Sequence, residues 1–332
     1  MPQGPTDLLA WLSIGLFVAG VLVEQRDKRV GRALTAAAWV TFGVFWGVLV
    51  PHFLLVEKSA IEGIASLAAV PASIYTGYLL WQGRDSLFVL SRAVAVMGVI
   101  YLPATTIQPV YEFLIEETTR QVALGIDLLG YSPEVTTNEE GVRNTFVFTT
   151  DGRTFETFII LACTGLGSMA IFAGVIAAVK APLDRKIEAL LVSVPVIWVL
   201  NIVRNVWIAT AFGKQWLQVG IEPVSALFGI PAGEEGLVSF YLADKVIAQS
   251  ASLVALLVIT FFVVRRLPEV TTVLEDTVYV LTRRELDLQS ELGLGVGGRR
   301  PATDGGRSAE VADGGPAADA ADGTADEGDP GR

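Results

Sequence analysis

Cysteine and histidine are almost absent from this sequence, which has one of each among 332 residues, and basic residues are outnumbered by acidic ones. A single cysteine cannot form a disulfide within the chain, and it leaves no CxxC motif or zinc-ligand cluster, so no metal or other cofactor is expected. The formal net charge is -11. That charge argues against nucleic acid as a partner, because phosphate binding needs a basic surface.

Long apolar runs dominate the sequence instead. Hydrophobic residues make up 52% of the chain, and runs of roughly 18 or more apolar residues indicate helices that cross a bilayer. The sequence therefore predicts an all-α, polytopic membrane protein with about seven transmembrane helices, two of which contain Pro71 and Pro195, as membrane helices tolerate. Their approximate ranges are 7–23, 33–56, 61–82, 86–103, 157–179, 187–212 and 237–264.

Basic residues are distributed unevenly among the connections between these helices. They gather after the first, third, fifth and seventh helices, as in the segment EQRDKRVGR at 24–32, whereas the alternate connections contain few. The positive-inside rule places the basic connections in the cytoplasm. We therefore expect the N-terminus outside the cell and the C-terminus inside, with an odd number of spans between them.

The predicted organisation has three parts. Residues 1–266 form a membrane-embedded catalytic domain, in which the long connection 104–156 is an extracellular insertion. A cytoplasmic helix is expected at 267–294. The remainder, 295–332, consists mostly of small and acidic residues and predicts a disordered acidic tail, a feature common in proteins from high-salt cells such as those of haloarchaea.

The insertion contains two local signals. YEFLIEETTRQVALGIDLLG at 111–130 predicts an amphipathic helix that lies on the membrane surface. The alternating segment that follows is centred on Asp151-Gly152, a dipeptide typical of hairpin turns, and predicts a small two-stranded ribbon.

Polar residues inside membrane spans are costly and are therefore functional candidates. Cys163 lies about six residues into the fifth predicted helix, roughly 10 Å below the outer surface. Arg204 falls in the outer third of the sixth helix, and Lys245 about two turns below the outer end of the seventh. The orientation rests on other residues, yet it puts all three at one level. His52 lies near the outer end of the second helix, also at that level.

Each candidate has a simpler interpretation as well. A lone membrane cysteine such as Cys163 is usually a small core residue, and His52 could be a packed side chain. Lys245 could extend to the outer head groups. Arg204 could do the same, but it shares one helix face with two amides, which favours a polar site over lipid. Those amides, Asn201 and Asn205, are candidate binding residues.

The chemistry of a cysteine site links these residues. Only the thiolate attacks well, and an adjacent cation favours it. Arg204 is always charged, so it could hold a thiolate or an oxyanion but could not act as a base. Thr164 and Gly165 follow the cysteine directly, and the glycine would let a substrate or a neighbouring helix come close. A serine–histidine site built on Ser168 is disfavoured, because that residue lies deeper and lacks a following glycine.

The segments LACTGLGS at 161–168 and NIVRN at 201–205, together with the multi-span layout, resemble the exosortase/archaeosortase family over roughly residues 7–265. The resemblance implies a membrane cysteine transpeptidase, with Cys163 as the nucleophile and Arg204 as the essential cation. The family's third site residue is an arginine or histidine near the outer end of a later span, where this sequence offers Lys245.

The resemblance also implies substrates and partners. Enzymes of this family cut secreted proteins near a C-terminal tripartite signal, which consists of a Pro-Gly-Phe-type motif, a transmembrane helix and a basic end. They join the new C-terminus to a membrane lipid, and surface-layer glycoproteins are typical substrates. The alternative is a multi-span transporter or binding scaffold, whose buried arginine and lysine would hold an anion.

Overall fold

The computed structural model describes residues 4–56 and 60–288, all of which belong to one compact unit. Among these residues, six helices are long and apolar enough to cross a membrane. Many of their large apolar side chains face outward, Leu191, Val203 and Leu257 among them, as a lipid environment allows. The chain is therefore an all-α, multi-pass membrane protein. The acidic tail predicted at 295–332 lies outside the described residues.

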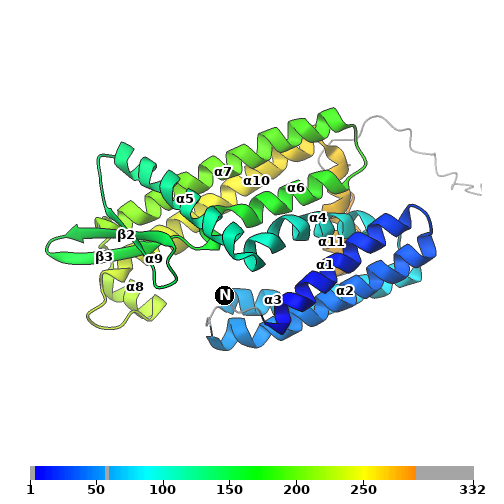
Figure 1. The fold of residues 1–332 in the computed structure, drawn as a ribbon, viewed down its shortest axis with the longest axis horizontal. Coiled ribbons are helices and arrows are strands. Elements are labelled where there is room, and N and C mark those ends of the chain that lie inside the picture. Colours follow the sequence, from blue (N-terminus) through cyan, green and yellow to red (C-terminus); the bar gives the residue numbers. More distant parts are fainter. Residues whose placement is uncertain (1–3, 57–59, 289–332) are drawn as a thin grey trace, which may run out of the picture. The chain divides into compact units, whose positions relative to one another are not determined.

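The first four helices are α1 (Pro5–Glu24), α2 (Lys28–Pro51), α3 (Ala60–Gln82) and α4 (Leu87–Thr106), and α4 packs against both α1 and α6 (Figure 1). The side chain of Asp27 caps α2 by accepting hydrogen bonds from the first backbone N–H groups.

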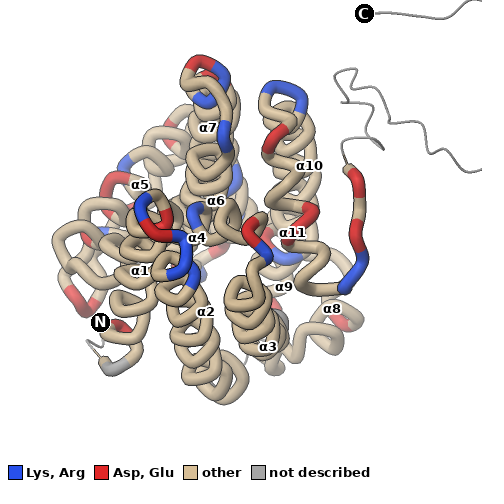
Figure 2. The backbone as a smooth tube through the Cα atoms, turned by 90° about the vertical axis from the view of Figure 1, so that its right-hand side faces the viewer, with Lys and Arg blue, Asp and Glu red and all other residues tan. Residues whose placement is uncertain are grey.

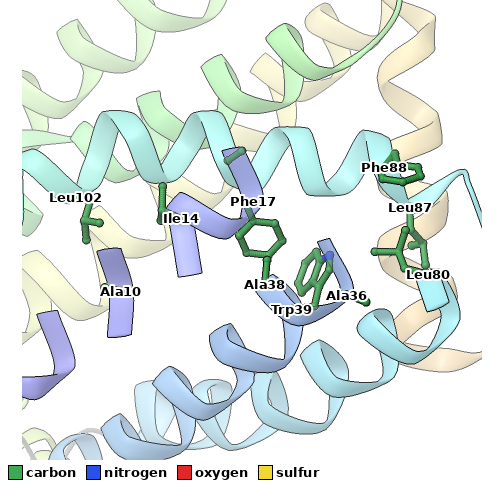
Figure 3. Packing of buried hydrophobic residues seen from close by; sticks show 11 residues of the cluster. Ala10, Ile14, Phe17, Ala36, Ala38, Trp39, Leu80, Leu87, Phe88 and Leu102 are labelled. Carbon is green, nitrogen blue, oxygen red and sulfur yellow. The ribbon is translucent and has the colours of Figure 1, made fainter. Parts of the chain in front are cut away.

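Aromatic side chains fill the space between α1, α2 and α4. The ring of Phe17 meets Trp39 edge-on at 5.1 Å, and both are buried (Figure 3). The indole N–H of Trp39 donates to the hydroxyl of Ser91 at 2.9 Å, so its polar atom is satisfied inside the bundle. Lipid is as apolar as these side chains, so close packing and interhelical hydrogen bonds stabilise the arrangement, not removal from water.

The insertion forms a helix and a sheet. Helix α5 (Gln108–Leu128) precedes β1 (Glu134–Thr137), β2 (Arg143–Thr150) and β3 (Arg153–Phe158), which form an antiparallel sheet in the order β1-β2-β3. The predicted turn at Asp151-Gly152 is confirmed, since both residues have positive φ and join β2 to β3. The sequence predicted a two-stranded ribbon, whereas the sheet has three strands because β1 also pairs with β2. The four-residue β1 is too short to show an alternating pattern.

The predicted amphipathic helix is present as α5. Its buried face, with Ile115, Val122 and Ile126, packs against the sheet and against Val206 of α7. Protein therefore covers one apolar face of α5, while Phe113 and Leu128 remain exposed.

The fifth predicted span differs most from the structure. Strand β3 continues to Phe158, a 3₁₀ turn η2 (Leu161–Thr164) follows, and α6 (Leu166–Ala178) has only 13 residues. At 1.5 Å per residue α6 is about 20 Å long, shorter than the ~30 Å hydrocarbon layer. Cys163 therefore lies on an irregular turn that caps a short helix, and not within a regular span.

The remaining elements form two long spans and their connections. Helix α7 (Leu183–Gly213) contains Pro195, and α8 (Ile221–Phe228) follows it. The last span combines α9 (Leu237–Tyr241), the π-helical η3 (Leu242–Ala248) and α10 (Gln249–Arg266). Long stretches of α2, α3 and α10 carry no charged residue (Figure 2).

The helix predicted at 267–294 is shorter than expected. A 3₁₀ turn η4 (Pro268–Val270) leads into α11 (Thr271–Thr282), which packs against α3 and α4. The helix ends where Arg283 adopts a left-handed conformation, with φ of 59°. The rest of the predicted range from 289 onward lies outside the described residues.

Candidate active site

Cys163 is held by the C-terminal half of α7 through its own backbone. The Nδ2 atom of Asn201 donates to the Cys163 carbonyl oxygen at 2.6 Å, and Nδ2 of Asn205 donates to the same oxygen at 2.7 Å. Asn205 also donates to the backbone oxygen of Asn201, one turn earlier. The two amides predicted to share a polar face therefore fix the position of the cysteine turn.

The residues after the cysteine make this close approach possible. Gly165 has φ of 74°, which L side chains rarely adopt, and a Cβ atom there would lie only 2.9 Å from Cγ of Asn201. Thr164 is buried, and its hydroxyl donates to the Leu161 carbonyl and accepts from the Leu166 N–H. Thr164 thus closes the turn and begins α6, while Gly165 lets the turn lie against α7.

Arg204 faces the last span, not the asparagines. Its Nη2 atom donates to Oδ1 of Asp244 at 2.6 Å, and Nζ of Lys245 lies 3.1 Å from Oδ2 of the same carboxylate. Asp244 and Lys245 both belong to the π-helical η3. The side chain of Asp244 is 10% exposed, compared with 24% for Arg204 and 56% for Lys245.

Sequence analysis missed Asp244. The signal was present, because an acidic residue within an apolar span is as costly as a basic one. Its neighbour Lys245 was singled out as a polar residue at the level of Cys163, whereas the adjacent Asp244 was not considered. The structure shows that this carboxylate, and neither amide, connects Arg204 to Lys245.

All three charges act on the Cys163 thiol. Burial of the side chain disfavours an anion there, Arg204 and Lys245 oppose that effect, and Asp244 adds to it. Two cations and one carboxylate leave an excess of one positive charge in the cluster, which we call the Arg204 cluster (Arg204, Asp244 and Lys245). The structure thus brings together the three candidates that sequence analysis placed at one level.

A pocket of about 70 Å³ opens beside the turn. Asn201, Arg204, Ser168 and Ser252 supply the polar part of its wall, and Gly165 with apolar residues of α7 and α10 supplies the rest. A pocket of this size can receive a small group close to the guanidinium and beside Gly165, which follows Cys163 by two residues along the chain. The apolar lining residues are Ile197, Leu200, Ala255, Leu256 and Ile259.

His52 takes no part in the contacts that join these residues. It begins the π-helical segment η1 (His52–Val56) at the end of α2, and its ring lies against Phe53. Ser168 does line the pocket, but the structure does not connect it to a histidine in the part of the chain it describes.

Comparison with known proteins shows which family the chain is similar to. A family model described as transmembrane exosortase (Exosortase_EpsH) matches residues 7–243. The chain belongs to this family. The matched range includes Cys163 and Arg204 and ends one residue before Asp244.

Two curated relatives are similar over most of the chain. Archaeosortase A of Haloferax volcanii is 47% identical over 305 residues, which cover 89% of this chain and 100% of the relative. Archaeosortase A of Natronomonas pharaonis is 44% identical over 284 residues, 83% of this chain and 89% of the relative. No solved structure matches the chain. The protein is thus an archaeosortase-type sorting transpeptidase of the membrane, and the transporter alternative is not favoured.

Proposed function

We propose that this exosortase-family protein acts through a cysteinyl intermediate, with Cys163 as the nucleophile and Arg204 as the group that stabilises the oxyanion. The observation that carries the proposal is that adjacent residues on one turn of α7 hold both parts. Asn201 and Asn205 anchor the backbone of Cys163, and Arg204 lies between them in sequence on the same helix. Nucleophile and cation are thereby fixed relative to each other, as acyl transfer requires.

The reaction proceeds in two balanced steps. The sulfur of Cys163 attacks the scissile carbonyl carbon, and the negative charge that develops on the carbonyl oxygen is stabilised by the guanidinium of Arg204. The C–N bond then breaks, and the leaving amine takes up the proton that the thiol gave up. In the second step a lipid nucleophile attacks the thioester and returns a proton to sulfur. Lys245, which pairs with Asp244, supplies the second cation and leaves the cluster with one excess positive charge.

The proposed substrates are secreted proteins with a C-terminal Pro-Gly-Phe-type motif, a transmembrane helix and a basic end, such as surface-layer glycoproteins, and the proposed acceptor is a membrane lipid. The relatives named archaeosortase A support this class of reaction. A site at the end of a short helix, beside a pocket that opens between spans, suits a peptide that leaves the membrane at that point.

Orientation is part of the proposal. The end of α7 that begins at Leu183 meets the end of α10 through the Arg266–Glu188 pair, and Arg185 pairs with Glu269 nearby. This basic end faces the cytoplasm under the positive-inside rule, so the Cys163 end faces outward. A cysteine introduced at Asp151 in a Cys163→Ser background should react with a membrane-impermeant maleimide in intact cells, while one at Thr282 should not. The reverse pattern would overturn the orientation.

The direct test of the function is the mass of a surface protein's C-terminus. The protein is co-expressed with a tagged surface protein that ends in the tripartite signal, and the product is compared with that of the Cys163→Ser variant. We expect the wild type to yield a truncated, lipid-linked product and Cys163→Ser to yield none. The matched control is Ser168→Ala, which removes the hydroxyl that lines the pocket and should still yield the truncated, lipid-linked product. Normal processing by Cys163→Ser would rule out cysteine catalysis.

A further inference from the structure

The guanidinium of Arg204 has one polar side-chain partner in the described chain. That partner is Asp244, which accepts from Nη2 alone. The asparagines on either side of Arg204 are engaged with the Cys163 carbonyl and do not touch it. The remaining N–H groups of Arg204, on Nε and Nη1, are left for whatever enters the pocket that the residue lines.

We propose that Asp244 is a positioning residue for the transpeptidase reaction, which holds Arg204 by one nitrogen so that its other N–H groups meet the oxyanion. The inference rests on the proposed function and adds a residue that the family match does not include. Asp244 is the most buried member of the Arg204 cluster, so its position is set by packing, whereas Lys245 extends into open space.

The backbone around Asp244 supports this assignment. Residues Leu242–Ala248 form a π-helix, which carries more residues per turn than an α-helix and therefore shifts Asp244 relative to the face that a regular helix would present. The indole N–H of Trp207 donates to the Ala243 carbonyl at 3.3 Å. Trp207 lies one turn after Arg204 on α7. The hydrogen bond from Arg204 to the Asp244 carboxylate and the one from Trp207 to the Ala243 carbonyl thus fix the π-helical segment against α7.

The negative charge of Asp244 also disfavours the thiolate form of Cys163. This charge acts on Cys163 in the direction opposite to Arg204 and Lys245. Removal of the charge should therefore have two opposite effects. Arg204 loses its support, which slows acyl transfer, and the field at the thiol becomes more positive, which favours the thiolate and speeds its alkylation. A merely structural residue would not produce this divergence.

The experiment uses the full chain, purified and placed in lipid vesicles, with Asp244→Asn as the main variant. Asparagine keeps the shape and one acceptor oxygen but loses the charge. We expect the maximal rate of transfer of the tagged surface protein to fall by about 10- to 100-fold. Alkylation of Cys163 by N-ethylmaleimide at neutral pH should become several-fold faster than in the wild type. Asp244→Glu, which restores the charge, should recover part of the transfer rate.

The matched control is Asp276→Asn in α11, because Asp276 is also a buried aspartate but contacts Ser86 and Arg84 instead of the site. Both its transfer and its alkylation should match the wild type. Asp244→Asn with a normal transfer rate would overturn the inference, and so would a parallel loss of transfer, alkylation and the thermal unfolding transition, which would show a structural role. If instead the wild type did not process the substrate, the proposed function would fail while the alkylation result still reported on Asp244.

Discussion

Two partly buried arginines of this protein have very different surroundings. Nη2 of Arg92, on α4, donates to both carboxylate oxygens of Glu24 on α1, at 2.9 and 2.7 Å. Their side chains are 19% and 12% exposed, similar to those of Arg204 and Asp244. The Arg92 pair contains one cation and one anion, whereas the Arg204 cluster contains two cations that share one carboxylate.

The comparison shows that burial alone does not mark a functional arginine. In the Arg92 pair each charge is neutralised by its partner, so the pair ties two helices together and offers little to a ligand. In the Arg204 cluster one positive charge is left over, and the guanidinium lines a pocket beside a cysteine. The excess of charge, and the free N–H groups that accompany it, give that region the capacity to stabilise a new negative charge.

The largest effect is expected from replacing each arginine by lysine and comparing the rates of processing. Arg204→Lys replaces a planar fork by a point charge that cannot serve Asp244 and an oxyanion together. We expect the rate of processing to fall by roughly 100- to 1000-fold, the usual range for loss of an oxyanion donor. Arg92→Lys, the matched control, should keep the rate per folded molecule. Equal rates for both variants, measured from the mass of the product, would show that Arg204 is only an anchor.

The second effect concerns the cysteine turn, where Gly165 combines a positive φ with a close approach to Asn201. Gly165→Ala places a methyl group against Asn201 and forces an unfavourable positive φ. The cysteine turn should move away from α7, and processing should fall by roughly 10- to 100-fold. Gly167→Ala is the control, because a Cβ atom there would meet only the Tyr101 ring, at an ordinary 3.8 Å. Similar activities for the two variants would contradict this account of the turn.

The third effect tests whether Lys245 contributes its charge to the site. Lys245→Ala leaves the carboxylate of Asp244 less neutralised, so alkylation of Cys163 at a fixed near-neutral pH should slow. Because Lys245 is more than half exposed, solvent screens it, and the change should be at most about tenfold. Lys245→Arg should restore the rate. An unchanged pH profile of alkylation, together with normal processing, would remove Lys245 from the site.

The smallest effect is expected on thermal stability at low pH, from the exposed ion pair between Arg32 and Asp85. The guanidinium of Arg32 donates two hydrogen bonds to Asp85 and holds the pKa of that carboxyl below its usual value. A depressed pKa stabilises the folded state above the unfolded value near 3.9 and loses that contribution as the pH falls through the folded value. Below about pH 4 the melting temperature should fall about 2 °C more in the wild type than in Asp85→Asn. Identical acid profiles would show that the pair contributes nothing.

Apolar runs were sufficient to predict where most helices lie. Helices α1 to α4, α7 and the last span each overlap a predicted range, with ends that differ by up to about five residues. About 20 consecutive apolar residues without charges have few alternatives to a membrane helix. The turn at Asp151-Gly152 could also be predicted from its own residues, since only a few residue types adopt positive φ there. Strand β1 and the short α6 were not predictable in this way, because their limits depend on neighbours far along the chain.

The site was predictable as a set of residues but not as a set of contacts. Cys163, Arg204 and Lys245 stand out because each is polar in an apolar span, and an approximate depth placed them at one level. The sequence suggested that Asn201 and Asn205 orient Arg204, whereas both amides hold the Cys163 carbonyl. Which acceptor an amide reaches depends on how two helices and a turn pack, and local spacing carries no information about that.

By itself, the sequence determined a multi-pass helical membrane protein with a cysteine and an arginine near one end of its spans. Hydrophobic length and charge placement decide these features, because the bilayer penalises every unpaired polar group in the same way. Only the tertiary structure decided that the cysteine lies on a turn ahead of a short helix, and that Asp244 supports Arg204 from a π-helical segment. Such contacts join residues some 40 positions apart, and their geometry follows from how the helices pack against one another.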